Sequence, residues 1–210
     1  MKNANWYFDF LSPFTYLQNC RIDEFSPDLN IQRKPVLFAG LLKHWGTKGP
    51  AELPAKRLFT YQHVHWLADQ LEAPLRFPEK HPFNPIALLR LCIAGGCTKN
   101  AVDAIFKCVW VEGLSGDNPD NWARFCDAVN IPESEATEKI SNPEIKQELK
   151  LNGEEAIEKG IFGVPTLLVD GHLFWGYDST DMALDYLDDP QLFESSDMKR
   201  VQSLPTGYGI

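Results

Sequence analysis

The feature that most constrains this chain is an aromatic strand that runs directly into the start of a helix. Residues 6–11 (WYFDFL) have the aromatic composition typical of a β-strand. Ser12 and Pro13 follow at once, a capping hydroxyl and a proline suited to the first turn of a helix. We therefore predict a strand, a tight turn and a helix that extends to about Phe25.

A second strand is expected after this helix. The turn signal at residues 26–28 (SPD) precedes a stretch with strand character over residues 30–38. Pro35 either restricts that strand to the edge of a sheet or ends it, because proline donates no backbone hydrogen bond. The chain is thus predicted to open with a β-α-β unit.

The middle of the chain, residues 50–150, is predicted to be helical. Three Asn-Pro pairs each place a capping side chain before a proline at the first helical position: Asn84-Pro85, Asn118-Pro119 and Asn142-Pro143. Apolar residues at steps of three and four predict another helix before Pro74: Leu58, Tyr61, Val64, Ala68 and Leu71. Residues 86–94 are nearly all apolar and stop at two glycines.

The end of the chain returns to strands. Residues 166–169 and 172–175 flank Asp170-Gly171, a favoured two-residue hairpin turn, and a last helix is expected over residues 180–187. This element order predicts an α/β protein with a thioredoxin-like fold and an inserted all-helical domain. The expected division is a thioredoxin-like domain over residues 1–49 and 151–190, a helical insertion over 50–150, and a loosely attached tail over 191–210.

Composition excludes several classes of function. The net charge of −9 argues against a protein that binds nucleic acid or anionic membranes. No apolar stretch approaches the roughly 20 residues of a membrane span, and residues 1–6 lack the pattern of a secretory leader. We therefore expect a soluble, cytoplasmic protein.

The cysteines and histidines indicate neither redox nor metal chemistry. The five cysteines are odd in number and none lies in a Cys-x-x-Cys pair, so no disulfide framework or dithiol centre is expected. Cys92, Cys108 and Cys126 lie in apolar helical patterns and are predicted to fill the core. The five histidines do not combine with other ligands at metal-binding spacings, so no metal site is predicted.

Ser12 is the first candidate functional residue. A hydroxyl that starts a helix lies where backbone N–H groups and the helix dipole favour a negative atom such as a thiolate. Lowering a thiol pKa by about two units requires about 2.7 kcal/mol. One hydroxyl hydrogen bond and a dipole term of up to about 2 kcal/mol can supply that. The alternative is that Ser12 is an ordinary N-cap.

Two further segments are candidates near the end of the chain. Pro165, at the entrance to a predicted strand, would in a cis form leave the backbone of Val164 free to bind a peptide as an added strand. In residues 175–178 (WGYD), Gly176 permits an unusual backbone angle, and Asp178 precedes a helix whose N–H groups suit a carboxylate while Asp178 suits an amine. The alternatives are an ordinary strand start and a plain helix cap.

These segments resemble one known family. Residues 8–16 (FDFLSPFTY) and residues 160–166 (GIFGVPT), continued by residues 175–178, are similar to the paired signatures of the 2-hydroxychromene-2-carboxylate isomerases, relatives of DsbA and the kappa-class glutathione transferases. The resemblance extends from about Trp6 to Leu187 and includes residues 49–57 (GPAELPAKR), Phe77-Pro78 and residues 81–85 (HPFNP).

The resemblance implies a DsbA-like thioredoxin fold in which Ser12-Pro-Phe-Thr15 replaces the usual Cys-x-x-Cys and glutathione supplies the sulfur. Ser12 would hold the glutathione thiolate. Val164 would pair with the cysteinyl backbone of glutathione, and the stretch Trp175, Gly176, Tyr177 and Asp178 would bind its γ-glutamyl end.

Substrate contacts carry over from the family less securely. The family's Gly-Asn in the loop before the helical domain is Gly46-Thr47 in this chain, which leaves Lys43, His44 and Lys48 as candidates for an anionic substrate, against solvated surface charges. Asn84 is either a helix cap or a substrate contact.

The implied function is a glutathione-dependent isomerase of 2-hydroxychromene-2-carboxylate or a similar conjugated aromatic α-keto acid, a step in the catabolism of aromatic compounds. The implied assembly is a homodimer. A kappa-like glutathione transferase and a non-catalytic peptide-binding module are the alternatives. Disulfide exchange is set aside because a hydroxyl at Ser12 cannot form a mixed disulfide.

Overall fold

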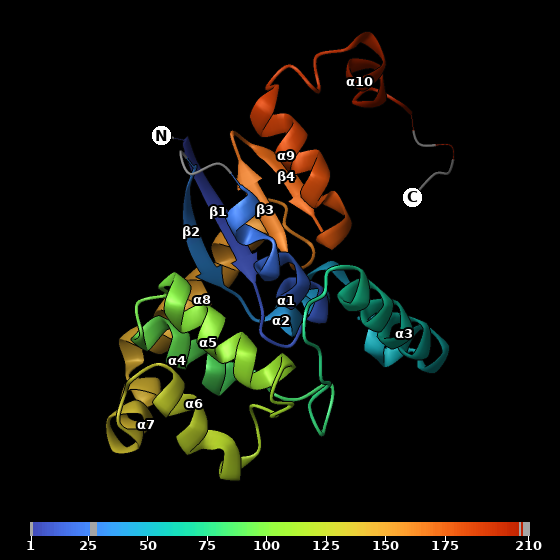
Figure 1. The fold of residues 1–210 in the computed structure, drawn as a ribbon. Helices are drawn as coiled ribbons and strands as arrows, with labels where there is room; N and C mark the ends of the chain where they lie inside the picture. The colour runs from blue at the N-terminus through green and yellow to red at the C-terminus, as the bar shows by residue number, and fades with distance from the viewer. Residues whose placement is uncertain (1, 26–28, 206, 208–210) are drawn as a thin grey trace.

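The sheet is mixed and has four strands in the order β2-β1-β3-β4 (Figure 1). The computed structural model describes residues 2–25, 29–205 and 207. Strand β1 pairs in parallel with β2 and antiparallel with β3, which forms a hairpin with β4. The strands are β1 (Lys2–Phe8), β2 (Leu29–Pro35), β3 (Thr166–Val169) and β4 (His172–Trp175).

Helices cover both faces of this sheet. Strand β1 directs Trp6 and Phe8 to one face and Tyr7 to the other, and all three are fully buried. Helices α1 (Pro13–Cys20) and α9 (Thr180–Asp188) pack on the Trp6 face. Helices α2 (Phe38–Trp45) and α8 (Pro143–Glu158) pack on the Tyr7 face.

The remaining helices form most of the segment between β2 and β3. They are α3 (Pro54–Gln70), α4 (Ile86–Ala94), α5 (Lys99–Trp110), α6 (Trp122–Ala128) and α7 (Glu133–Ser141). Short 3-10 turns are η1 (Ile22–Glu24), η2 (Pro50–Glu52), η3 (Pro119–Asn121) and η4 (Tyr177–Ser179). Helix α10 (Ser196–Val201) lies in the tail.

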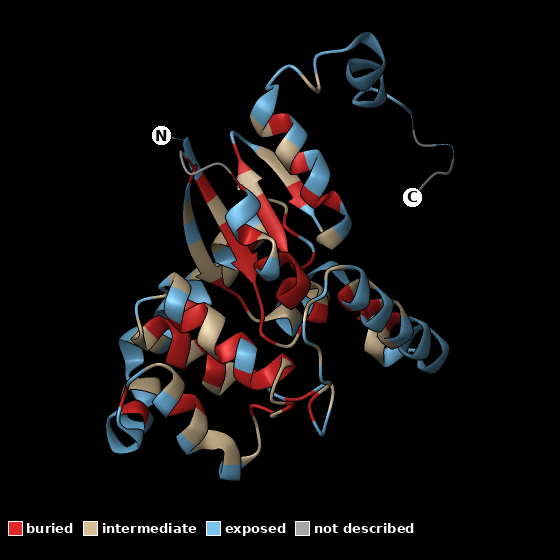
Figure 2. Ribbon diagram, viewed as in Figure 1, coloured by how far each residue is buried: buried red, intermediate tan, exposed pale blue. Residues whose placement is uncertain are grey.

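Buried residues continue from the strands into α4 and α5 (Figure 2). One aromatic core joins the helical segment to the sheet. The ring of Phe106 on α5 lies 6.4 Å from Trp6, 6.1 Å from Phe8 and 4.8 Å from Phe10, measured between ring centroids. Helix α8 also runs without a break across residue 150, where a domain boundary is expected from the sequence. The helical segment therefore shares its core with the sheet.

The local signals at both ends of the chain are confirmed. Helix α1 starts where the sequence places it, whereas strand β1 shares only residues 6–8 with the predicted strand, beginning at Lys2 and ending at Phe8. Asp170 and Gly171 have φ values of 51° and 85°, as a two-residue hairpin turn requires, and Val169 pairs with His172. The apolar residues 86–94 are helical and the two glycines follow them, as the sequence indicates.

Several predicted boundaries are wrong. The second strand ends at Pro35, and Phe38 begins α2. The opening helix ends at Cys20, because residues 22–24 form the separate 3-10 turn η1. Helix α4 begins at Ile86 with Pro85 in the capping position, one residue later than expected.

Two predictions about packing also fail. Leu58, expected on the buried face of α3, is 62% exposed, whereas Val64 and Ala68 are buried as expected, together with Thr60. The tail is not loose at its start, because Phe193 stacks on His172 and Tyr186, with ring centroids 4.8 and 5.5 Å apart.

The cysteines predicted to fill the core do so. Cys92, Cys108 and Cys126 are fully buried. Cys97 has a positive φ of 49° and its sulfur lies 3.8 Å from that of Cys92, a contact between residues that flank the end of α4. Among the described residues, no cluster of three metal-ligating side chains is found, and no helix is long and apolar enough to cross a membrane.

We predict that Phe106→Ala lowers the free energy of unfolding by about 3–5 kcal/mol, because it removes a buried ring that contacts both the sheet and the loop after it. Urea unfolding followed by circular dichroism measures the change. Leu151→Ala, at an exposed position of α8, is the control and is expected to stay within about 0.5 kcal/mol of the wild type. Equal losses in the two variants would contradict a shared core.

Candidate active site

Ser12 begins α1 at the end of the sheet. Its φ and ψ of −87° and 118° are those of an N-cap, and its Oγ accepts the Thr15 N–H at 3.3 Å, so the capping role is real. A hydroxyl also has one hydrogen to donate, and the Ser12 O–H meets no acceptor within residues 2–25 and 29–205. The cap therefore uses an acceptor of Ser12 and leaves its donor for a ligand.

Both peptide groups that precede Ser12 are held at both polar atoms. In the Phe10–Leu11 peptide, the Phe10 carbonyl accepts Trp110 Nε1–H at 3.0 Å and the Leu11 N–H donates to Asp9 Oδ1 at 3.0 Å. In the Leu11–Ser12 peptide, the Leu11 carbonyl lies 2.9 Å from His81 Nε2 and the Ser12 N–H donates to the Asp9 carbonyl at 3.1 Å. The backbone orientation at Ser12 is thus fixed from two sides.

Asp9 is a site residue to which the sequence assigned no role. Its carboxylate is fully buried; Oδ1 accepts Leu11 N–H, and Oδ2 accepts the Phe38 N–H that begins α2, at 2.9 Å. Burial raises the pKa of this carboxyl to about 7, and the two backbone N–H groups counter only part of that rise. An acidic residue inside an aromatic strand was the available signal.

His81 and Trp110 were also missed, because their contacts with residues 10 and 11 are distant in sequence. His81 lies in the loop between α3 and α4, and Trp110 ends α5. Their rings lie 5.5 Å apart. The sequence marked His81 only as part of the HPFNP motif.

The segment before β3 lies at the same end of the sheet as Ser12. Tyr7 pairs with Thr166, so the end of β1 and the start of β3 are neighbours. The Val164–Pro165 peptide bond is cis, the form that the sequence left open. Within the described residues, the backbone N–H and carbonyl of Val164 have no hydrogen-bond partner, as a peptide-binding edge requires.

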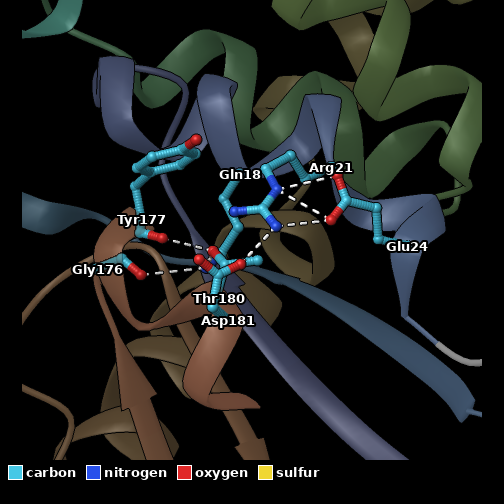
Figure 3. A network of polar contacts seen from close by, with 7 residues as sticks. All are labelled: Gln18, Arg21, Glu24, Gly176, Tyr177, Thr180 and Asp181. Atoms are coloured by element: carbon cyan, nitrogen blue, oxygen red, sulfur yellow. Dashed lines mark hydrogen bonds and ion pairs between the residues drawn. The ribbon is translucent and has the colours of Figure 1, made fainter. Parts of the chain in front are cut away.

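Residues 175–178 are hydrogen-bonded to the segment before β3 and to α1; the contacts with α1 are drawn in Figure 3. The Gly176 N–H donates to the Pro165 carbonyl at 2.9 Å. From α1, Gln18 Nε2 donates to the Gly176 carbonyl at 3.2 Å and to Thr180 Oγ1 at 3.1 Å. Three segments singled out by sequence are therefore joined by direct hydrogen bonds.

Within residues 175–178, Gly176, Tyr177 and Asp178 differ in backbone conformation, packing and exposure. Gly176 has φ of 89° and ψ of 163°, a conformation almost confined to glycine, and an added Cβ would lie 2.5 Å from Asp178 Oδ1. The Tyr177 ring packs against the core beneath Arg21, whose guanidinium carbon lies 5.8 Å from the ring centroid. Asp178 is exposed just before α9. Asp178 is thus the accessible polar side chain of the stretch.

Exposed aromatic rings flank Val164. Trp175 is 52% exposed and Phe162 is 43% exposed, and their ring centroids lie 4.8 Å apart in an edge-to-face pair. The Trp175 ring covers Gly163 so closely that an added Cβ there would lie 2.4 Å from Trp175 Nε1. Trp45 at the end of α2 donates to the Ile161 carbonyl at 2.9 Å. An apolar surface therefore adjoins the free backbone of Val164.

The expected substrate residues are not joined to this group of segments. Lys43, His44 and Lys48 are all exposed around the end of α2. Asn84 is exposed, and its side-chain oxygen accepts the Ile86 N–H at 3.1 Å, which is a capping contact. Substrate binding by Lys43 and Asn84 stays a prediction.

Two surface hollows lie away from the candidate site. One of about 560 Å³ lies between α7 and α8, and one of about 320 Å³ lies between α2, α4 and α8. Neither is lined by Ser12, Val164 or residues 175–178. The candidate site is therefore defined by the segments that converge on it.

A thioredoxin-like sheet, a cis-proline before β3 and a helix start that carries serine in place of cysteine define a class of thioredoxin-fold proteins without a dithiol. The chain belongs to the DSBA-like thioredoxin domain family, which matches residues 5–188.

Named relatives agree with this assignment. The chain is 25% identical over 192 residues to a 2-hydroxychromene-2-carboxylate isomerase of Sphingobium xenophagum, covering 89% of this chain and 98% of that protein. It is 26% identical over 201 residues to human glutathione S-transferase kappa 1, covering 86% and 88%. A solved 2-hydroxychromene-2-carboxylate isomerase superposes with a TM-score of 0.80 at 26% identity, covering 92% of this chain and all of that one.

We predict that Asp9→Asn removes a pH dependence of stability. A carboxyl pKa raised from 3.8 to about 7 on folding stabilises the protein below pH 4, and this contribution is lost as pH rises through 7. Between pH 4 and 7 the wild type should therefore lose about 2–4 kcal/mol of unfolding free energy relative to the variant. Urea unfolding at several pH values measures the slopes; parallel profiles would show that Asp9 titrates normally.

Proposed function

We propose that this protein is a glutathione-dependent isomerase that acts on 2-hydroxychromene-2-carboxylate or a similar conjugated aromatic α-keto acid. The observation that carries the proposal is the Ser12 O–H at the start of α1, which has no acceptor among the described residues and can donate to a bound thiolate. The similarity to named isomerases over nearly the whole chain supports the reaction type. We place the protein in the cytoplasm, within a route of aromatic catabolism.

The residues present fit glutathione. The free backbone edge of Val164 suits the central residue of a tripeptide, and the Ser12 O–H suits its sulfur. The Asp178 carboxylate suits the α-amine of the γ-glutamyl end, and the N–H groups that begin α9 suit its carboxylate. Trp175, Gly176 and Tyr177 are proposed to line the same γ-glutamyl part of the site.

Glutathione, when bound, supplies a thiolate that adds reversibly to the conjugated double bond and leaves unchanged, so that rotation becomes possible in between. Ser12 stabilises the negative sulfur by a hydrogen bond, with the help of the N-terminal dipole of α1. Lys43 is proposed to attract the substrate carboxylate, and Asn84 to contact the substrate from the loop before α4. No cysteine of this chain takes part.

A glutathione transferase is the second candidate, favoured by the 26% identity to the human kappa enzyme. The same thiolate would then remain attached to the substrate carbon, and the conjugate would be released. The two reactions differ in glutathione consumption, which is nil for isomerisation and stoichiometric for transfer. Measuring free thiol during turnover of trans-o-hydroxybenzylidenepyruvate and of an activated aryl halide separates them.

We predict that Ser12→Ala raises the pKa of the bound glutathione thiol by about 1–2 units, because the charged sulfur loses a hydrogen bond. Thiolate absorbance near 240 nm against pH measures the shift. Ser195→Ala, which removes the equivalent cap from α10, is the matched control and should leave that pKa unchanged.

Asp178→Asn should weaken glutathione binding about tenfold or more by calorimetry, whereas Asp185→Asn on the exposed face of α9 should not.

If the wild type binds no glutathione, the enzyme proposal fails and a peptide-binding module becomes the better account. A peptide that binds at the Val164 edge with equal affinity in Ser12→Ala would support that alternative.

We also propose that the protein acts as a homodimer through α3. Leu58, Phe59 and Trp66 of this helix are 62%, 65% and 56% exposed, an apolar stripe that continues through His63 to Phe14 of α1. In an antiparallel pair of α3 helices centred between Gln62 and His63, Phe59 faces Trp66 of the second copy. The same register sets Lys56 against an opposite charge, Asp69.

We predict that Lys56→Asp and Asp69→Lys each shift the protein toward monomer and that the double variant restores the dimer, because the charges are then exchanged across the two-fold axis. Light scattering after size-exclusion chromatography measures the mass. A wild type that is monomeric at 100 micromolar, on the order of ten times the dissociation constant of a weak dimer, would contradict the proposal.

A further inference from the structure

The loop that carries Ser12 receives a hydrogen bond from a side chain of the helical segment. His81 Nε2 lies 2.9 Å from the Leu11 carbonyl, which belongs to the peptide group directly before Ser12. A carbonyl oxygen only accepts, so Nε2 carries a hydrogen and donates it. The second polar atom of the same peptide group, the Ser12 N–H, is bonded to the Asp9 carbonyl at 3.1 Å. His81 therefore supplies one of the two bonds that orient this peptide plane.

The ring of His81 is itself fixed. Its Nδ1 lies 2.6 Å from the Tyr61 hydroxyl, whose oxygen also lies 3.1 Å from the His81 carbonyl, so the hydroxyl contacts two acceptors of the same residue. With the hydrogen on Nε2, the Nδ1 of a neutral ring is the shorter of these two acceptor contacts. Burial lowers the pKa of His81, which favours the neutral form. The rings of Phe77 and Trp110 lie 6.1 and 5.5 Å away and restrict its rotation. A partly buried donor packed among aromatic rings thus points at the loop.

We propose that His81 is a positioning residue for Ser12: its Nε2–H, aligned by the Tyr61 hydroxyl, holds the Leu11–Ser12 peptide so that the Ser12 O–H is directed at the glutathione sulfur. His81 acts through the backbone of Leu11 and touches no ligand. The inference rests on the proposed glutathione site. It assigns to the helical segment a part in thiolate stabilisation that the strand and helix of Ser12 do not supply alone.

The first test compares two substitutions of His81. His81→Phe keeps an aromatic ring among Phe77 and Trp110 but removes the donor, whereas the Gln side chain of His81→Gln can again donate to the Leu11 carbonyl. In His81→Phe the pKa of the bound glutathione thiol should rise by about one unit, a tenfold loss of thiolate at a fixed pH below it, and His81→Gln should recover most of this loss. Both variants should bind glutathione within about threefold of the wild type.

The matched control is His65→Phe. His65 lies on α3 and its ring centroid is 5.3 Å from that of Phe77, yet it makes no hydrogen bond to residues 9–12. The same change of residue type next to the same ring should leave the thiol pKa at the wild-type value. Tyr61→Phe should give an effect between those of the control and His81→Phe, because it frees the tautomer and keeps the donor.

A folded His81→Phe variant that binds glutathione with an unchanged thiol pKa would overturn the inference. So would wild-type histidine ¹⁵N shifts that place the His81 hydrogen on Nδ1, a result that needs no variant. If the wild type binds no glutathione, the proposed function fails separately. Amide hydrogen exchange then tests the inference without glutathione. With the global stabilities of the two proteins matched by denaturant, the Ser12 amide should exchange at least tenfold faster in His81→Phe than in the wild type. Equal exchange rates would refute the role of His81.

Discussion

The buried carboxylate of Asp9 is the contact on which the arrangement of the site depends. One oxygen binds the backbone of the loop that leads into α1, and the other binds the first N–H of α2. The same side chain therefore binds backbone groups at or just before the starts of two helices on opposite faces of the sheet. Removing a carboxylate from water is costly, so two charge-directed hydrogen bonds in the interior restrict the backbone positions that this strand end can take. The geometry at Ser12 follows from that restriction.

The helical segment completes the same construction. Trp110 and His81 each reach back to the loop after β1, and Phe106 fills the space between that loop and the sheet. These residues lie some 70 to 100 positions from the loop in sequence. The helices are thus part of the structure that orients the candidate catalytic hydroxyl, and not only a cover over a substrate.

Sequence reasoning succeeded where the determinants are local. An aromatic run followed by Ser-Pro, and an Asp-Gly pair between two short strands, each specify their structure within a few residues. It failed for α2, because a short apolar run over residues 36–38 resembles a strand and the cap at Leu37 has no polar side chain. What begins α2 is Asp9, 29 residues earlier.

The same limit applies to the site. Ser12, Val164 and Gly176 stand in recognisable motifs, and the structure joins the segments that hold them. Tyr61 and Trp110 are visible in the sequence only as aromatic residues of helical stretches, and His81 only as part of the HPFNP motif, since their significance arises from contacts that span the chain. Leu58 shows the converse error, in which regular apolar spacing indicated burial on a helix that is largely exposed.

The pairing of β1 with β3 has a consequence for synthesis of the chain. Tyr7 meets Thr166, so one edge of the central strand waits for a partner that is translated 159 residues later. At about 5–20 residues per second that interval is roughly 8–32 s. During it, an apolar strand carrying Trp6, Tyr7 and Phe8 presents an open edge, the kind of surface on which nascent chains associate wrongly. The yield of correctly folded protein should therefore depend on how that edge is shielded while the ribosome translates the residues between Tyr7 and Thr166.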